Sequence, residues 1–240
     1  MSGHSKWANI KRRKGAQDAV RSKIFQKLAK EIYVAAKNGD SDPKNNANLR
    51  MVIDKARGEN MPNDKIKNAI DKASNSADSS NFEEVRYEGY GPNGIAIMVD
   101  CLTDNRNRTA PLVRSTLSKS GGNLGTDGSV SFMFVKKGII IIDNKYDEDE
   151  VMMNVLDNGA DDFIVNDDTY EIYTTQDNFI KVKDALDNMG VDNYIMSEVT
   201  YVASNEIELD VDKKEKIYKL VETLEDFEDV SNVYHNMKED

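Results

Sequence analysis

The order of secondary-structure elements between residues 138 and 203 constrains the fold more than any other feature. Strand-like apolar runs alternate with amphipathic helical stretches in the order strand, helix, strand, strand, helix, strand. The expected strands cover 138–143, 161–166, 170–175 and 194–202, and the helices cover 147–158 and 178–189. This order is that of the ferredoxin-like α+β fold. We therefore predict an inserted domain over residues 137–204.

The segments on either side of this insertion predict a second α+β unit. Its expected strands are 84–90, 95–102, 129–136 and 229–235, and its expected helices are 107–119 and 212–225. The turn formers GPNG at 91–94 join the first two strands as a hairpin. We therefore predict a discontinuous domain made of residues 82–136 and 205–240.

The N-terminal region has helical periodicity. Helices are expected at 15–38, 47–57 and 64–74, the last with Asn63 as its cap. SNSADSSN at 74–81 has neither periodicity nor apolar residues and reads as a linker. Residues 1–76 then form a basic helical domain, and the fold class is α+β and multidomain: an N-terminal helical domain followed by two ferredoxin-like-type α+β domains, the middle one discontinuous.

The lengths of the apolar runs and the number of cysteines indicate the cellular compartment of the protein. No apolar run approaches the roughly 18 residues that span a bilayer, and the positive N-terminus is not followed by the apolar region of a secretory signal. The single Cys101 excludes an internal disulfide. We expect a cytoplasmic protein without membrane partners.

The residues that could carry catalysis are few. The two histidines, His4 and His235, lie at opposite ends, and no Cys/His cluster has zinc spacing. We therefore predict no catalytic residues, no metal site, no cofactor and no enzymatic activity. The acidic runs DEDE at 147–150 and EDFED at 225–229 lack calcium-loop spacing and are interpreted as solvated helix ends.

Two glycine-rich motifs resemble nucleotide-binding loops. GYGPNG at 89–94 matches the dinucleotide fingerprint, but a strand-like run follows it where the fingerprint requires a helix. GGNLGTDGS at 121–129 lacks the Gly-Lys-Ser/Thr ending of a phosphate loop and also precedes a strand. We interpret both as turns, the second with a remaining alternative of close approach to a partner's backbone.

Charge divides the chain into two unlike parts. Residues 1–80 hold 17 Lys and Arg against 9 Asp and Glu, a balance of +8, and residues 81–240 hold 15 against 34, a balance of -19. These sum to the net charge of -11. The asymmetry predicts a basic module that meets phosphate, carried on an acidic body that repels it.

The strongest functional signal is the basic N-terminal stretch, residues 5–23, which holds seven Lys or Arg, one Asp and one Trp. Clustered cations with an aromatic residue suit phosphate contact combined with base stacking. Such cations contact the phosphate backbone of the nucleic acid and do not distinguish one base sequence from another. The predicted nucleic-acid-binding residues are Lys6, Trp7, Lys11, Arg12, Arg13, Lys14, Arg21, Lys23 and Lys27.

A second cationic group surrounds the expected start of the helix at 107–119. Helix N-termini attract anions, so this group is a candidate anion or partner contact. An equal alternative is that its arginines pair with acids of the acidic body. The residues are Asp104, Asn105, Arg106, Arg108 and Arg114.

Long motifs in three parts of the chain resemble the YebC/PmpR family of probable transcriptional regulatory proteins. They are GHSKWANIKRRKGAQDAVRSKIFQKLAKEI with NMPNDKIKNAI, YEGYGPNGIAIMVDCLTDNRNRT with GGNLGTDGSVSFMF, and DVSNVYHNM. The resemblance implies a helical domain followed by two α+β domains, cytoplasmic location and DNA binding in transcription control. It places the basic motif on Lys6, Trp7 and 11–14, and a strand-to-helix motif on 104–108. SNSADSSN departs from the Gly-rich linker of relatives.

Three functions compete at this point. The first is a DNA-binding transcriptional regulator whose acidic domains bind a protein partner. The second is a ribosome-associated translation factor that binds ribosomal RNA, which the resemblance also allows because a mitochondrial relative is a translational activator of cytochrome oxidase. The third is an acidic interaction scaffold whose basic stretch docks on an acidic partner. We predict a nucleic-acid-binding regulator of gene expression, with transcription first and translation as the alternative.

Overall fold

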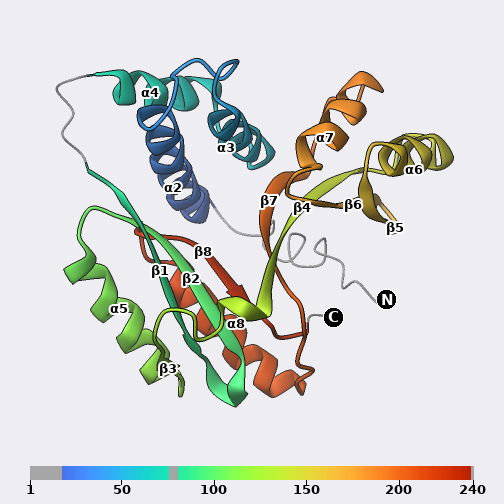
Figure 1. The fold of residues 1–240 in the computed structure, drawn as a ribbon. Helices are drawn as coiled ribbons and strands as arrows, with labels where there is room; N and C mark the ends of the chain where they lie inside the picture. Colours follow the sequence, from blue (N-terminus) through green and yellow to red (C-terminus); the bar gives the residue numbers. More distant parts are fainter. Residues whose placement is uncertain (1–17, 76–80, 239–240) are drawn as a thin grey trace.

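The structure is a computed structural model that describes residues 18–75 and 81–238 (Figure 1). Its first part, the helical unit, packs three helices around a small core of Leu28, Ile32, Leu49, Ile53 and Ile66. These helices are α2 (Asp18–Lys37), α3 (Ala47–Gly58) and α4 (Asn63–Ser74). The helical prediction for this region is confirmed.

Asn46 joins the end of α2 to the start of α3. Its side-chain oxygen accepts a hydrogen bond from the Leu49 N–H at 3.0 Å, and its amide donates to the carbonyls of Ala35 and Asp40. The predicted cap of α4 was wrong, because Pro62 occupies the N-cap position and Asn63 is the first helical residue. Proline has no N–H to lose at a helix start, so it is tolerated there.

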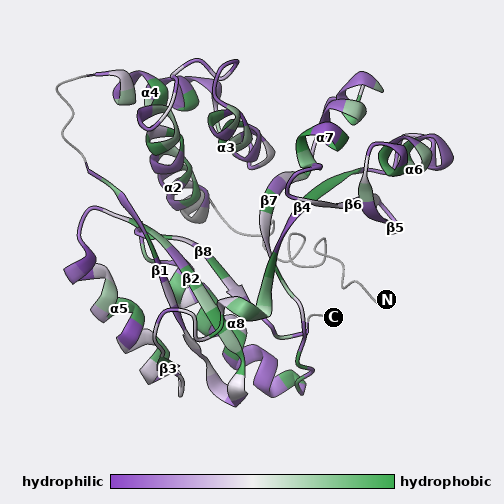
Figure 2. Ribbon diagram, viewed as in Figure 1, coloured by the Kyte–Doolittle hydropathy of each residue, from purple (hydrophilic) through white to green (hydrophobic). Residues whose placement is uncertain are grey.

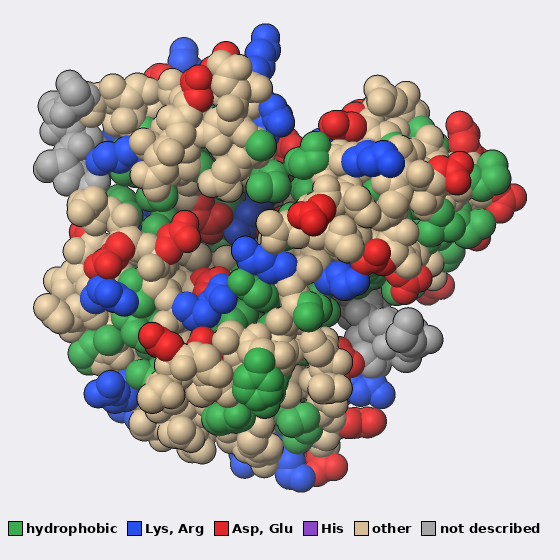
Figure 3. All heavy atoms as spheres, in the orientation of Figure 1, with side chains coloured by type: hydrophobic (Ala, Val, Ile, Leu, Met, Phe, Trp, Pro, Cys, Tyr) green, Lys and Arg blue, Asp and Glu red, His purple; other side chains and the backbone are tan. Residues whose placement is uncertain are grey.

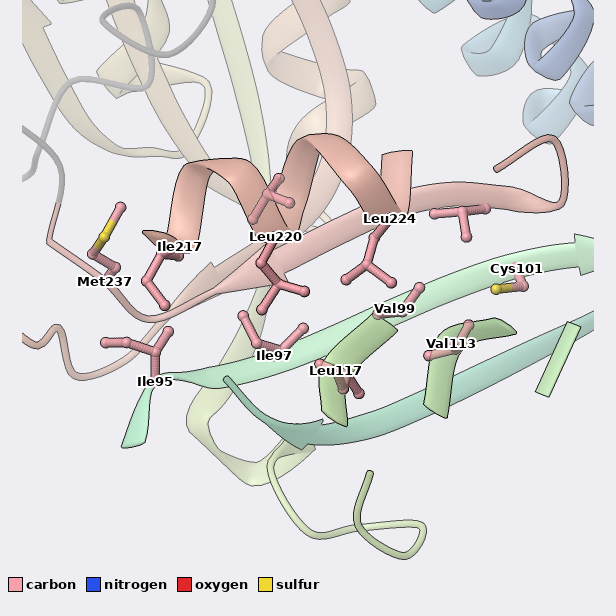
Figure 4. Close-up of a cluster of buried hydrophobic side chains, with 12 residues drawn as sticks. Ile95, Ile97, Val99, Cys101, Val113, Leu117, Ile217, Leu220, Leu224 and Met237 are labelled. Carbon is pink, nitrogen blue, oxygen red and sulfur yellow. The ribbon is translucent and has the colours of Figure 1, made fainter. Parts of the chain in front are cut away.

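The first sheet is antiparallel and has the strand order β3-β1-β2-β8. Helices α5 and α8 cover one face of this sheet. There Ile97 and Val99 of β2 pack against side chains of both helices, namely Val113 of α5 and Leu220 and Leu224 of α8 (Figure 4). The elements are β1 (Glu83–Tyr90), β2 (Ala96–Thr103), α5 (Arg106–Lys119), β3 (Asn123–Leu124), α8 (Val211–Glu225) and β8 (Val230–His235).

The second sheet has the order β5-β6-β4-β7, and its elements follow the predicted βαββαβ sequence. The face covered by α6 and α7 buries Ile140, Ile142, Ile172, Phe179 and Val182, and Figure 2 shows β4 as hydrophobic over much of its length. The elements are β4 (Phe134–Asp143), α6 (Glu148–Asp157), β5 (Ala160–Val165), β6 (Thr169–Thr175), α7 (Phe179–Asn188) and β7 (Met196–Ala203). The α+β class is thus confirmed.

The separate strands expected at 129–136 and 138–143 were wrong. The structure has a short turn, η2 (Ser131–Met133), followed by the continuous strand β4, and the first sheet takes the two-residue β3 as its edge instead. Gly138 lies within β4, where a Cβ would stand 2.2 Å from Thr174 Oγ1 and 2.6 Å from the Phe179 ring. This glycine permits close packing rather than ending a strand. β4 crosses the expected boundary at 136/137, and the domain boundaries themselves stay predictions.

Glu88 of β1 anchors the glycine-rich segment after β3. The side chain is buried, and its carboxylate accepts hydrogen bonds from the backbone N–H groups of Gly128, Val130 and Ser131 at 2.7 to 2.9 Å. Burial alone would raise the pKa of Glu88, but these donors outweigh it and hold the pKa below its usual value. The ionised carboxylate therefore stabilises the fold.

We predict that Glu88→Gln lowers the free energy of unfolding by about 1 to 3 kcal/mol, because an amide NH₂ then faces backbone donors. Urea denaturation at neutral pH measures this, with the exposed Glu84→Gln of the same strand as control. Because the pKa of Glu88 is lower in the folded than in the unfolded protein, its ionised carboxylate stabilises the fold above the unfolded pKa of about 4.3. This stabilisation is lost as the pH falls through the folded pKa. The gap between wild type and Glu88→Gln should therefore narrow below about pH 4; a gap independent of pH would contradict the assignment.

Candidate nucleic-acid interface

The structure divides the predicted nucleic-acid-binding residues into two groups. Arg21, Lys23 and Lys27 lie on α2. The remaining six lie outside the described residues, so their assignment stays a prediction: Lys6, Trp7, Lys11, Arg12, Arg13 and Lys14.

The polar face of α2 lies against residues 225–229, which we call the acidic segment and which connects α8 to β8. Lys23 Nζ is 2.9 Å from Asp226 Oδ1, and Lys27 Nζ donates to the backbone carbonyl of Glu225. Lys30 Nζ is 3.0 Å from Glu228 Oε1 and 3.5 Å from Asp229 Oδ1. Lysines at positions 23, 27 and 30 thus share one side of α2 because helical neighbours recur at three- and four-residue steps.

The acidic segment is therefore more than a solvated helix end, and that interpretation was wrong for Asp229, which is only 5% exposed. Asp226 and Glu228 remain exposed. The other acidic run behaves as predicted: residues 147–150 are exposed at the start of α6, and Asp147 caps that helix by accepting from the Glu150 N–H.

Asp229 is also the main partner of the cations at the start of α5. Its Oδ2 accepts hydrogen bonds from Arg108 Nε at 3.1 Å and Nη2 at 2.6 Å, and from the hydroxyls of Thr103 and Thr109. Burial would raise the pKa of Asp229, but the hydrogen bonds from Arg108 and Thr109 and the charge of Lys30 lower it. The carboxylate thus occupies the guanidinium of Arg108, which an external anion would otherwise use.

The five residues predicted around α5 do not gather into one open site. Asn105 caps the helix by accepting from the Arg108 N–H at 3.1 Å, and Asp104 Oδ1 lies 3.0 Å from Arg108 Nη2. Arg106 Nη1 lies 3.7 Å from Glu83 Oε2, and Arg114 is exposed further along the helix. For Arg106 and Arg108 the structure therefore shows the alternative in which arginines pair with acids of the same body.

The pocket beside Arg108 is small and mixed in charge. It has a volume of about 110 Å³ and is lined by Arg108, Thr109, Leu112 and residues 227–229. Because Glu228 and Asp229 form part of its wall, the pocket offers an anion two negative charges along with the guanidinium. A role for this region in effector or partner contact stays a prediction.

Residues of α4 form a cationic surface that the sequence analysis did not select. Lys65, Lys67 and Lys72 are exposed, and Lys65 Nζ stands 5.1 Å from the centre of the Phe25 ring. Lys72 Nζ stands 5.7 Å from the Tyr33 ring. The spacing of the lysines could have indicated this surface, since residues 65 and 72 are seven apart and share a helix face. Isolated lysines among acidic residues are, however, a weak indication of nucleic-acid binding in a sequence.

A part-buried ion pair joins the helical unit to the second sheet. Lys55 Nζ of α3 is 3.0 Å from Glu31 Oε2 of α2 and 3.9 Å from Glu198 Oε2 of β7. Burial would lower the pKa of Lys55, but the charges of Glu31 and Glu198 raise it above its usual value. Figure 3 shows cationic and anionic side chains together in the hollow between the helical unit and the two sheets.

The two glycine-rich motifs have structural explanations. The GYGPNG stretch spans the end of β1 and the turn η1 (Pro92–Gly94), and β2 follows without a helix. In the second motif Gly121 and Gly128 have φ values of 84° and 82°, which glycine adopts without strain. A Cβ on Gly122 would stand 2.1 Å from the Tyr90 carbonyl, so the turn also needs glycine for close backbone approach.

Other chemistry is sparse within residues 18–75 and 81–238. No group of three or more His, Cys, Asp or Glu side chains there is placed to hold a metal ion. Cys101 is buried, and burial raises the pKa of its thiol to about 12, so it packs as an apolar residue. In the same part of the chain no helix is both long enough and apolar enough to cross a bilayer.

Fold and site together define an α+β protein in which a basic helical unit rests on acidic parts of two antiparallel sheets. The family models for the TACO1/YebC N-terminal domain and for the TACO1/YebC second and third domain match residues 5–76 and 82–237. The chain belongs to the TACO1/YebC family, which confirms the resemblance seen in its motifs.

Curated relatives match over their full length. The chain is 51% identical over 242 residues to a "Probable transcriptional regulatory protein" of Geobacillus thermodenitrificans, covering 100% of this chain and 98% of the relative. It is 50% identical over 243 residues to "Probable transcriptional regulatory protein YrbC" of Bacillus subtilis, covering 99% and 100%. A crystal structure of the conserved hypothetical protein Aq1575 from Aquifex aeolicus matches with a TM-score of 0.81 and 38% identity, over 92% of this chain and 91% of that one.

We predict that Asp229→Ala lowers the free energy of unfolding by about 2 to 4 kcal/mol, because the buried hydroxyls of Thr103 and Thr109 lose their acceptor and Arg108 loses its ion pair. Thermal and urea unfolding measure the loss. Asp104→Ala removes the exposed acid on the same guanidinium and should lower that free energy by less than about 1 kcal/mol. Equal losses for the two variants would contradict the role given to Asp229.

Proposed function

We propose that the protein is a cytoplasmic nucleic-acid-binding regulator of gene expression, and in the first place a DNA-binding transcriptional regulator. The observation that carries the proposal is the segregation of charge, with a balance of +8 in residues 1–80 and -19 in residues 81–240. A cationic module attracts phosphate backbones, and the acidic body limits contact to one side. The names of the relatives, which are probable transcriptional regulatory proteins, support the same assignment.

In this mechanism the basic N-terminal stretch and the helical unit capture nucleic acid by its backbone. Lysines of α4 extend the cationic surface beyond the stretch, and Asp64 and Asp71 on that helix disfavour a single continuous phosphate track. The acidic sheets are left to contact a protein partner. Nothing in this scheme requires catalysis, a cofactor or a metal.

A ribosome-associated, RNA-binding translation factor is the second candidate. It is favoured by the cations that stand over aromatic rings on the helical unit, Lys65 over Phe25 and Lys72 over Tyr33. Structured RNA is recognised through shape, phosphate and stacking rather than through a code in the major groove. Such a surface would suit RNA without base-specific side chains.

We predict that replacing Lys11, Arg12, Arg13 and Lys14 together with Ala abolishes most nucleic-acid binding. The slope of log affinity against log salt concentration should fall by about three to four, since each lost phosphate contact removes about 0.9 on duplex DNA. Fluorescence anisotropy with a labelled random-sequence duplex measures both. The control replaces Lys119, Lys213, Lys216 and Lys219, which are exposed on α5 and α8, and retained affinity in the first variant with an unchanged slope would remove the stretch from the mechanism.

A second experiment separates transcription from translation. Cell lysate is run on a sucrose gradient with and without RNase, and chromosomal DNA bound to the protein is recovered from the same cells. Transcription predicts absence from ribosomes and enrichment on particular promoters. Co-sedimentation with ribosomes that RNase abolishes, without DNA recovery, would instead establish the translation factor.

A further inference from the structure

The acidic segment, residues 225–229, places carboxylates on the side of α2 that carries Lys23, Lys27 and Lys30. Lys23, which belongs to the predicted nucleic-acid-binding set, and Lys30 lie 2.9 and 3.0 Å from carboxylate oxygens, the distance that a phosphate oxygen would adopt, whereas Lys27 donates to a backbone carbonyl. We propose that the acidic segment is an intramolecular competitor for phosphate, which nucleic acid must displace from α2. This inference rests on the proposed function and adds a mode of regulation to it.

Exposure identifies which contacts can exchange. The side chains of Lys23 and Asp226 are 51% and 69% exposed, and the Glu228 side chain is 70% exposed, whereas its partner Lys30 is only 16% exposed and also faces Asp229. Surface ion pairs of this kind contribute little to stability, so the carboxylates of Asp226 and Glu228 can leave their lysines without unfolding the helix end. Asp229 differs, because Arg108, Thr103 and Thr109 hold its buried carboxylate in place.

The apolar contacts of α2 show that exchange needs no movement of the whole helical unit. Tyr33 and Val34 are buried together with Leu102 of β2, and the Tyr33 ring packs edge-on against Phe82 at 5.9 Å. These residues lie beyond the lysines toward the C-terminal end of α2. The helix can stay docked there while the side chains of Asp226 and Glu228 turn away and phosphate oxygens replace them.

Competition has a consequence for the salt dependence of binding. A free lysine that neutralises a phosphate releases counterions from the nucleic acid, whereas a lysine paired with a carboxylate must first give up that carboxylate, which takes up cations in turn and reduces the net release. Removing the competing carboxylates should therefore increase affinity and make the salt dependence steeper, by up to about 0.9 for each lysine returned to solvent. Removing negative charge elsewhere on the protein would raise affinity but would leave the slope of log affinity against log salt concentration unchanged.

The test compares Asp226→Asn/Glu228→Gln with the matched pair Asp167→Asn/Asp177→Asn, which removes the same charge from exposed positions beside β6. The probes are a labelled random-sequence DNA duplex and an RNA hairpin. We expect the first pair to bind about three- to tenfold more tightly at low salt with a slope steeper by about one, since Lys23 is released while Lys30 keeps Asp229, and the second pair to change affinity by less than about twofold.

A double-mutant cycle isolates the local contact. Asp226→Asn should tighten binding in the wild-type background and lose that effect in Lys23→Ala, because the lysine it releases is then absent. Equal behaviour of the two charge pairs, or an Asp226→Asn effect that persists without Lys23, would overturn the competitor while leaving nucleic-acid binding intact. Failure of wild type and of Asp226→Asn/Glu228→Gln to bind either probe would overturn the proposed function and the inference with it.

Discussion

The carboxylate of Asp229 is the point at which the helical unit and the first sheet depend on each other. It accepts hydrogen bonds from Arg108 and Thr109 at the start of α5 and from Thr103 at the end of β2, and its other oxygen lies 3.5 Å from Lys30 of α2. Breaking a buried ion pair leaves an uncompensated charge, which is strongly unfavourable. This fixed charge is one of the contacts that hold α2 over the acidic segment.

Two further polar contacts complete the assembly. Lys55 bridges Glu31 and Glu198, which holds α3 against β7. Arg86 of β1 forms a bidentate pair with Asp100 and lies 4.4 Å from the ring of Tyr201 on β7, so it joins the two sheets. The units thus meet through charged groups as well as through apolar contacts, with Tyr33 and Val34 of α2 against Leu102 of β2 and Met98 of β2 in one cluster with Phe134 of β4, and each unit also has its own apolar core. The charged contacts at these junctions are more sensitive to salt and charge substitution than the apolar contacts are.

Local patterns were sufficient to predict most elements, because periodicity and turn residues act over short distances. The helices α2 and α3 and the βαββαβ order were predictable for this reason. The two-residue β3 has too little sequence to carry a pattern, and Lys136-Lys137-Gly138 reads as a break although β4 runs through it. Only the packing of Phe179 and Thr174 against Gly138 explains the glycine there.

The candidate site was less predictable, since its contacts join distant positions. Composition revealed the charge asymmetry, and the helical spacing placed Lys23, Lys27 and Lys30 on one side of α2. No local rule indicates that residues 225–229 return to that side, about 200 positions later in the chain. The sequence also left the pairing of Arg108 open, and only the fold brings Asp229 to it.

The distribution of burial decides how these charges divide between structure and function. Asp229 and Lys55 are held by several partners in part-buried surroundings, so their charges belong to the architecture. Asp226 and Glu228 are exposed, and the pair of Asp226 with the half-exposed Lys23 is weak enough for a polyanion to replace it. One short segment thus combines a fixed carboxylate that positions α2 with exchangeable ones that occupy its cationic side. An acidic body can in this way carry a basic module without neutralising it permanently.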